Sequence, residues 1–80
     1  MFNLIKSYFK DESYYIIISN NYIHIKNYKS IESLSSKELI ILIDKYKYII
    51  DGINMIISKK INNEIQIKGN ITNIIRYDNN

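Results

Sequence analysis

Residues 63–77 read NEIQIKGNITNIIRY, and this stretch is the strongest indicator of the fold. Isoleucines alternate with polar residues up to Gly69, which is the period of a strand with one buried face. After Gly69 the isoleucine spacing changes. A glycine inside a strand pattern indicates a bulge, a bend or a close approach of backbones. We therefore interpret Gly69 as a structural glycine that bends or bulges the chain, so that Ile67 and Ile71 both reach one core.

The second glycine of the chain, Gly52, stands in a similar context. Each glycine follows an isoleucine and a charged residue, and each precedes a run of isoleucines. The spacing differs by one residue, so the two units form a weak echo and not a strict repeat. We expect Gly52 to be structural as well.

Composition bounds the size and class of the protein. Eighty residues make one small domain, and about a quarter of them are isoleucine. The chain has no cysteine, which excludes disulfides and thiolate metal sites. The net charge is +3 and the sequence pI is about 9.1. The basic residues are scattered among acidic ones, whereas a nucleic-acid binder usually carries a denser basic patch.

Paired strands are expected before and after the middle of the chain. Residues 14–19 and 22–26 form two apolar runs around Asn20-Asn21, a hairpin signal. Residues 54–58, 64–68 and 71–77 are further strand candidates, with Asn62-Asn63 as a second turn.

Residues 35–52 allow two interpretations. Ser35 and Glu38 fit a helix capping box, and apolar residues follow at helical spacing. Against this, the segment has no alanine and is rich in β-branched and aromatic residues, which favours strands at 38–43 and 46–50 with a turn at Asp44-Lys45.

Residues 1–12 differ from the remainder, 13–78, which we assign to the β domain. Phe2, Ile5 and Phe9 fall at helical spacing, so we expect a short N-terminal helix or a tail, with a membrane-interface helix as a weaker alternative. No secretory signal and no membrane-spanning apolar run is visible, and we expect a cytoplasmic protein.

No residue pattern indicates an enzyme. His24 is the single histidine, and the carboxylates are dispersed without metal-ligand spacing. We expect no catalytic residue, cofactor, metal ion or small-molecule substrate. Tyrosines interleave with lysines, and we choose Tyr22, Lys26, Tyr46 and Tyr48 as a candidate interface for a protein partner. Single-stranded nucleic acid is the alternative partner if these four share one exposed face.

Three motifs in order carry a resemblance to a known family. They are I-x-N-Y-K-x-I at residues 25–31, I-x-G-x-N-x-x-I at 50–57 and I-x-I-x-G-x-I-x-x-I-x-x-Y at 65–77. Residues 16–77 thereby resemble the YabP/YqfC family of small sporulation proteins of endospore-forming bacteria. The motif positions that we single out are Asn27, Tyr28, Asn54, Ile67, Ile71 and Tyr77.

The resemblance implies an all-β middle segment and a role in building the spore envelope in the mother cell. It also implies a membrane protein as partner, which would place the chain at the membrane periphery. The expected fold is a small all-β domain of short antiparallel strands and hairpins, as a meander or small sandwich. A stacked-coil solenoid is the alternative, given the echo. Either arrangement leaves isoleucine-rich edges, from which we expect self-association or a partner protein.

Overall fold

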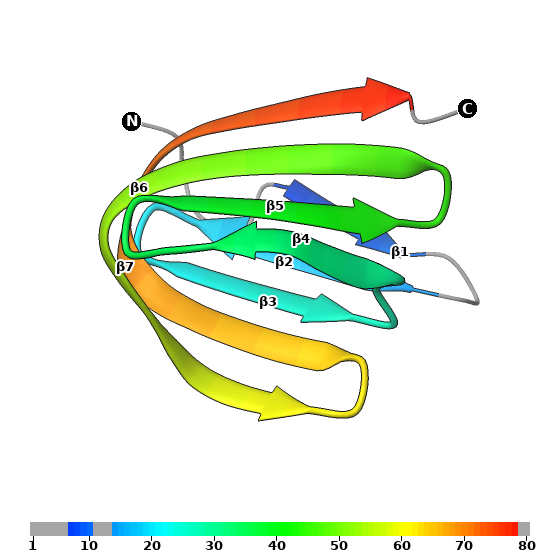
Figure 1. The fold of residues 1–80 in the computed structure, drawn as a ribbon, viewed down its shortest axis with the longest axis horizontal. Helices are drawn as coiled ribbons and strands as arrows, with labels where there is room; N and C mark the ends of the chain where they lie inside the picture. The colour runs from blue at the N-terminus through cyan, green and yellow to red at the C-terminus, as the bar shows by residue number, and fades with distance from the viewer. Residues whose placement is uncertain (1–6, 11–13, 79–80) are drawn as a thin grey trace.

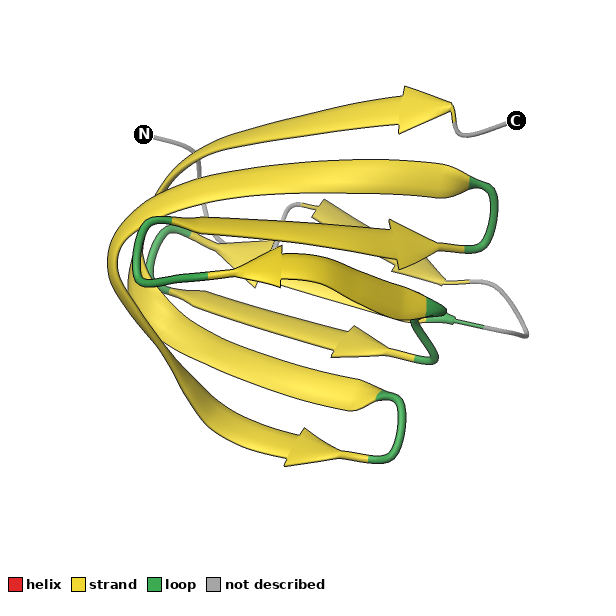
Figure 2. Cartoon of the chain, viewed as in Figure 1, coloured by secondary structure: helices red, strands yellow, loops and turns green. Residues whose placement is uncertain are grey.

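Seven antiparallel strands and no helix make up the part of the chain that the computed structural model describes, residues 7–10 and 14–78 (Figure 2). The strands are β1 (Ser7–Lys10), β2 (Tyr15–Ser19), β3 (Tyr22–Lys26), β4 (Ser30–Leu34), β5 (Glu38–Ile43), β6 (Tyr46–Ile61) and β7 (Glu64–Asp78). They form one sheet in the order β1-β2-β3-β7-β6-β5-β4. The all-β prediction is confirmed, and the strand interpretation of residues 35–52 is the correct one.

The long hairpin of β6 and β7 folds this sheet over on itself (Figure 1). Both strands curve sharply near their middles, at the left of the view. The first half of β7 pairs with β3, and the first half of β6 pairs with β5. Each long strand therefore belongs to both layers of a small sandwich, and the core lies between the layers.

The sharp bend that β6 and β7 share, which we call the corner, is built around Met55. This side chain is 3% exposed and packs against both glycines. A Cβ on Gly52 would lie 2.7 Å from the carbonyl O of Asn70 and 2.8 Å from Sδ of Met55. A Cβ on Gly69 would lie 2.7 Å from Cα of Met55. Gly69 has a φ of +159°, which residues with a Cβ rarely adopt, so the backbone conformation and the close approach of two backbones both require glycine there. The prediction that both glycines are structural agrees with this packing.

Three bulges interrupt the β6–β7 ladder. Asn54 and Met55 together oppose Gly69, Thr72 is unpaired opposite the Asp51–Gly52 step, and Ser58 is unpaired farther along. Gly69 keeps the inward position in the alternation that runs from Ile65 to Ile71. The change of isoleucine register that the sequence places at Gly69 therefore occurs at Thr72, because an extra residue in one strand reverses the side-chain alternation beyond it.

Two hairpin turns form backbone hydrogen bonds with the corner. The backbone N–H groups of Gly69 and Ile71 donate to the carbonyls of Asn21 and Asn20, at 3.3 and 2.9 Å. On the other layer, the N–H groups of Gly52 and Met55 donate to the carbonyls of Lys37 and Ser36, both at 2.9 Å.

The serine of the supposed capping box serves a turn instead of a helix. The backbone N–H groups of Lys37 and Glu38 both donate to Oγ of Ser35, each at 3.1 Å. Serine makes the same local bonds in turns as at helix N-termini, so the motif alone does not decide between them. The predicted turns at Asn20-Asn21, Asp44-Lys45 and Asn62-Asn63 are confirmed.

Isoleucine dominates the core, because alternate residues of β2, β3, β5 and β7 point inward. Nine large side chains are less than 2% exposed: Ile16, Ile23, Ile25, Leu39, Ile41, Ile43, Ile50, Ile65 and Ile67. No polar or charged residue is buried among the described residues. The fold is therefore held by apolar packing and the strand ladder.

Three expectations need correction. Over Ser7–Lys10 the helix prediction is wrong, because this segment pairs with β2; residues 1–6 and 11–12 lie outside the described ones. Residues 54–58 and 71–77 are not separate short strands, since pairing continues past each glycine. The solenoid alternative is wrong as well: the two glycines echo each other because the two strands of one hairpin bend at one corner. In the described segments, no helix could cross a membrane.

Candidate functional site

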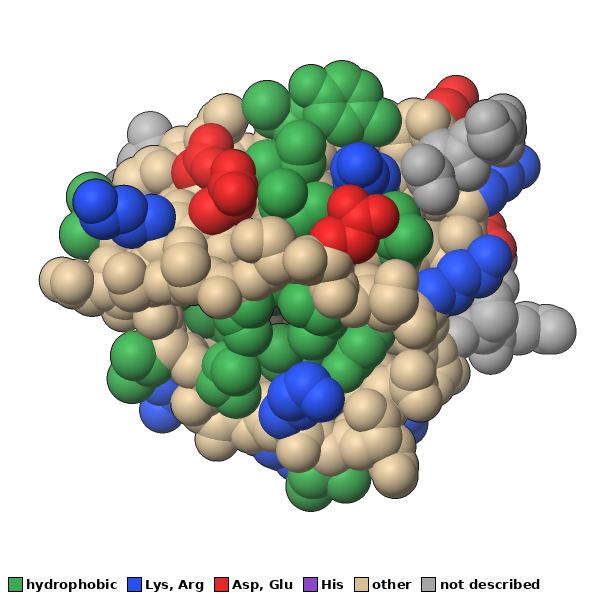
Figure 3. Space-filling view, viewed as in Figure 1, with side chains coloured by type: hydrophobic (Ala, Val, Ile, Leu, Met, Phe, Trp, Pro, Cys, Tyr) green, Lys and Arg blue, Asp and Glu red, His purple; other side chains and the backbone are tan. Residues whose placement is uncertain are grey.

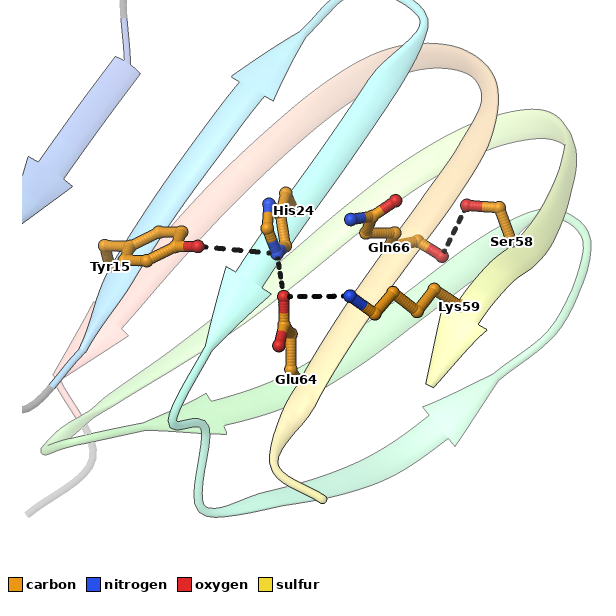
Figure 4. Close-up of polar contacts among 6 residues, drawn as sticks. All are labelled: Tyr15, His24, Ser58, Lys59, Glu64 and Gln66. Atoms are coloured by element: carbon orange, nitrogen blue, oxygen red, sulfur yellow. Dashed lines mark hydrogen bonds and ion pairs between the residues drawn. The ribbon is translucent and has the colours of Figure 1, made fainter. Parts of the chain in front are cut away.

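A polar cluster lies on the outer face of the layer formed by β2, β3 and the first half of β7 (Figure 4). His24 on β3 is central, with its Nε2 2.6 Å from Oε2 of Glu64 and 3.5 Å from the hydroxyl of Tyr15. The ring of Tyr15 meets the imidazole edge-on, with centroids 5.3 Å apart. Nζ of Lys59 lies 3.7 Å from the same Glu64 oxygen. Sheet register brings the four together from β2, β3, β6 and β7.

The electrostatics of this cluster favour an ionised glutamate. The hydrogen bond from His24 lowers the pKa of Glu64, and the nearby charge of Lys59 lowers it further. The side chains of His24 and Glu64 are 14% and 22% exposed, so the pair is half-buried. Sequence-based reasoning identified His24 only as the single histidine of the chain. It missed Glu64, because the two residues are 40 positions apart and only the β3–β7 pairing joins them.

The cluster supplies a histidine–carboxylate pair with a tyrosine hydroxyl and a lysine beside it. No group of three or more potential metal ligands occurs in the described part of the chain. The neighbouring hydroxyl of Ser58 donates to the carbonyl of Gln66 at 3.2 Å, away from the imidazole (Figure 4). A nucleophile within reach of the base is the minimum for Ser–His chemistry. We interpret the cluster as a cross-strand polar network that ties β3 to β7.

The candidate interface of Tyr22, Lys26, Tyr46 and Tyr48 does not form one surface. Tyr22 and Lys26 lie on the outer face of β3, whereas Tyr48 is 4% exposed and belongs to the core. Tyr46 packs against the core beside it, and the guanidinium carbon of Arg76 lies 4.4 Å from its ring centroid. As a single interface, this prediction is wrong. The sequence shows that side chains alternate around Tyr48. Which face of β6 points into the core is set by its pairing with β5 and β7.

The residues of the three sequence motifs have mainly structural positions. Asn27 and Asn54 adopt positive φ values of 64° and 56°, a region that asparagine enters more easily than most residues. Tyr28, Ile67 and Ile71 are buried in the core. Most motif positions therefore specify turns, the corner and the core. Tyr77 is the exception, being 51% exposed.

Each of the two long strands has an open edge over half of its length. In the described ranges, residues 56–61 of β6 pair only with β7, and residues 72–78 of β7 pair only with β6. Every exposed large apolar side chain described belongs to one of these two strands: Ile53, Ile56, Ile57, Ile61, Ile75 and Tyr77. Figure 3 shows hydrophobic side chains gathered at the top of the view, over β7 and β6. A free edge combined with exposed isoleucine is the arrangement that pairs with another strand.

Comparison with known proteins gives no family assignment. No family model, no curated protein and no solved structure matches the chain.

Proposed function

We propose that this protein is a non-enzymatic assembly factor whose activity is to bind other proteins through its open strand edges. The observation that carries the proposal is the exposed isoleucine on the free edges of β6 and β7. A free edge offers a row of backbone donors and acceptors, and exposed apolar side chains add favourable burial when a partner covers them.

The proposed process is endospore formation. The chain would act in the mother cell during assembly of the spore envelope, together with a membrane protein. This part of the proposal is supported by the three motifs that resemble the YabP/YqfC family.

The nucleic-acid alternative receives no support from the side-chain positions. It required Tyr22, Lys26, Tyr46 and Tyr48 on one exposed face, and Tyr48 lies in the core. We therefore do not propose it as a second function.

The test has a genetic arm and a biochemical arm. Deletion of the gene from the sporulating host should lower the yield of heat-resistant spores, and a plasmid copy should restore it. A tagged chain should co-purify one specific protein from the detergent-solubilised membranes of sporulating cells. Normal resistant spores from a deletion strain without a paralogue, together with no membrane partner, would refute the proposal.

The variant Ile57→Glu provides a matched probe of the edge. Ile57 is 44% exposed at the open edge of β6, so a charge placed there can still reach water. The substitution should abolish binding of the partner, whereas Lys45→Glu, in the β5–β6 turn, should retain it.

A further inference from the structure

A gap without backbone pairing separates β4 from the second half of β6, and hydrogen bonds close it at both ends. Residues 27–28, which precede β4, are tied to the β6–β7 turn: the N–H of Asn27 donates to the carbonyl of Asn63 at 2.6 Å, and Nδ2 of Asn63 donates to the carbonyl of Tyr28 at 2.9 Å. Residues 36–37, which follow β4, are tied to the corner through the bonds to Gly52 and Met55. β4 and residues 56–61 therefore run in opposite directions between the same two ties. No backbone ladder joins them.

The opening exposes core-facing side chains. Ile57 lies opposite Ile67, so it shares the inward face of the layer, yet it is 44% exposed whereas Ile67 is 0% exposed. On the other side, Ile31 and Leu34 lie opposite the buried Ile41 and Leu39, and both remain half-buried. These side chains face the interior of the sandwich but no described strand covers them.

The surface view shows this opening as a groove. In Figure 3 a hollow lined by hydrophobic side chains lies below the ridge formed by β4 and above the lower half of the β6–β7 hairpin, with a basic side chain at its lower rim. Residues 56–61 give the groove about 20 Å of extended chain. That length suits one short strand.

The rim of the groove is positively charged. Lys60 lies opposite Ile65 and so shares the side of Ile57, while Lys29 and Lys37 flank the two ends. All three are exposed, and none makes an ion pair with another described residue. The nearby carboxylates already have cationic or imidazole partners: Glu32 lies 3.3 Å from Lys47, and Glu64 contacts His24 and Lys59.

We infer that this groove binds an extended segment of a partner protein that has an apolar centre and acidic ends, and that the segment adds to the free edge of β6. The apolar side chains at the centre would cover Ile57 and Leu34, and the acidic ones at the ends would meet Lys29, Lys37 and Lys60. Strand addition supplies main-chain hydrogen bonds, and alternate side chains supply selectivity. This inference rests on the proposed function and names the partner chemistry.

A second copy of the chain fits the groove less well. If the β6 edges of two copies paired, each copy would contribute residues 53–61. This segment carries Lys59 and Lys60 and no carboxylate. Pairing two such edges would bring four lysines together, and only the Lys59 of each copy has a carboxylate partner, Glu64, so association at low ionic strength is disfavoured.

The test uses three synthetic eight-residue peptides as probes and the uniformly ¹⁵N-labelled protein. The first peptide has four valines at its centre and two glutamates at each end, in the second lysine replaces glutamate, and in the third serine replaces valine. Amide shifts are recorded up to millimolar peptide. Only the first should bind, with shifts concentrated at residues 30–34 and 55–61, and raised salt should weaken it.

Two charge variants test whether the lysines of the rim are responsible for peptide binding. Lys60→Glu should weaken binding of the valine–glutamate peptide at least about fivefold, because the reversal replaces a favourable surface charge interaction with a repulsive one. Lys45→Glu makes the same change in net charge in the distant β5–β6 turn and should bind like the unmodified protein. Both variants should keep the wild-type melting temperature.

Several results would overturn the inference. These are an equal effect of the two variants, equal binding of the lysine peptide, shifts confined to residues 72–78, or no shifts at millimolar peptide. Shifts at residues 55–61 that grow with protein concentration alone would assign the edge to a dimer. If peptides fail while the membrane partner is still captured in cells, only this inference fails and the proposed function stands.

Discussion

Substitution of Gly69 by alanine should destabilise the protein strongly without altering its surface. The added Cβ would lie 2.7 Å from Cα of Met55, 3.0 Å from its Cγ and 3.1 Å from the carbonyl O of Asn54. The Cγ can move, but Cα and the carbonyl belong to the backbone of β6 at the corner. Relief therefore requires the two long strands to separate locally, which disturbs the bulge opposite Gly69.

The expected cost is that of overpacking a dense interior, about 2–3 kcal/mol. In a domain of this size each kcal/mol lowers the melting temperature by about 4–8 °C, so the variant should melt about 10–20 °C lower. Gly69→Val should be worse, since its two methyl groups have no space. Circular dichroism in a thermal scan measures both, and urea unfolding gives the free energy independently.

Lys68→Ala is the matched control, one residue earlier on β7 with an exposed side chain. It should change stability by no more than about 0.5 kcal/mol. If Gly69→Ala melted within about 2–3 °C of the wild type, the argument from close approach would be refuted. If stability were unchanged but partner binding disappeared, Gly69 would be part of a binding site instead.

Three further predictions concern single side chains. Asn54→Ala should cost about 1 kcal/mol and Asn54→Gly nearly nothing, because Asn54 has a φ of 56°; thermal melts of the two variants check this. The pKa of Glu64 is lowered from 4.5 by the bond from His24, so its contribution to stability exists above pH 4.5 and is lost as the pH falls through the lowered value. The difference in urea midpoint between wild type and Glu64→Gln should therefore shrink between about pH 6 and about pH 3, and a constant difference would contradict the assignment. Burial raises the pKa of Tyr48 above 10.0, so stability should fall as the pH rises above that value, and Tyr48→Phe should reduce this loss in melts between about pH 9 and about pH 11.

Local pattern was enough to find most strands and turns. Apolar runs on either side of Asn20-Asn21 identified β2 and β3, alternation identified the first half of β7, and asparagine pairs located two turns. Residues 35–52 were ambiguous because Ser35 and Glu38 satisfy a helix signal that the structure uses in a turn. The choice depended on β-branched content and on resemblance, and neither measures what the segment packs against.

The candidate sites were less predictable than the strands. Sequence spacing cannot place Glu64 beside His24, since their interaction arises from the antiparallel pairing of β3 with β7. Nor could it separate Tyr48 from Tyr22, because both sit in alternating strands whose inward faces are set by their neighbours. The open edge of β6 is evident only when the sheet order is known.

The sequence by itself determined that this is a small all-β domain with an isoleucine core and two glycines that serve the backbone. Those properties follow from local periodicity and from residue chemistry, which act over a few positions. The tertiary structure alone decided that the two glycines meet Met55 at one corner, that one sheet folds into two layers, and that β4 and β6 leave a groove between them. These depend on strand order and on bulges, which involve residues far apart in the chain and are not encoded in any local pattern.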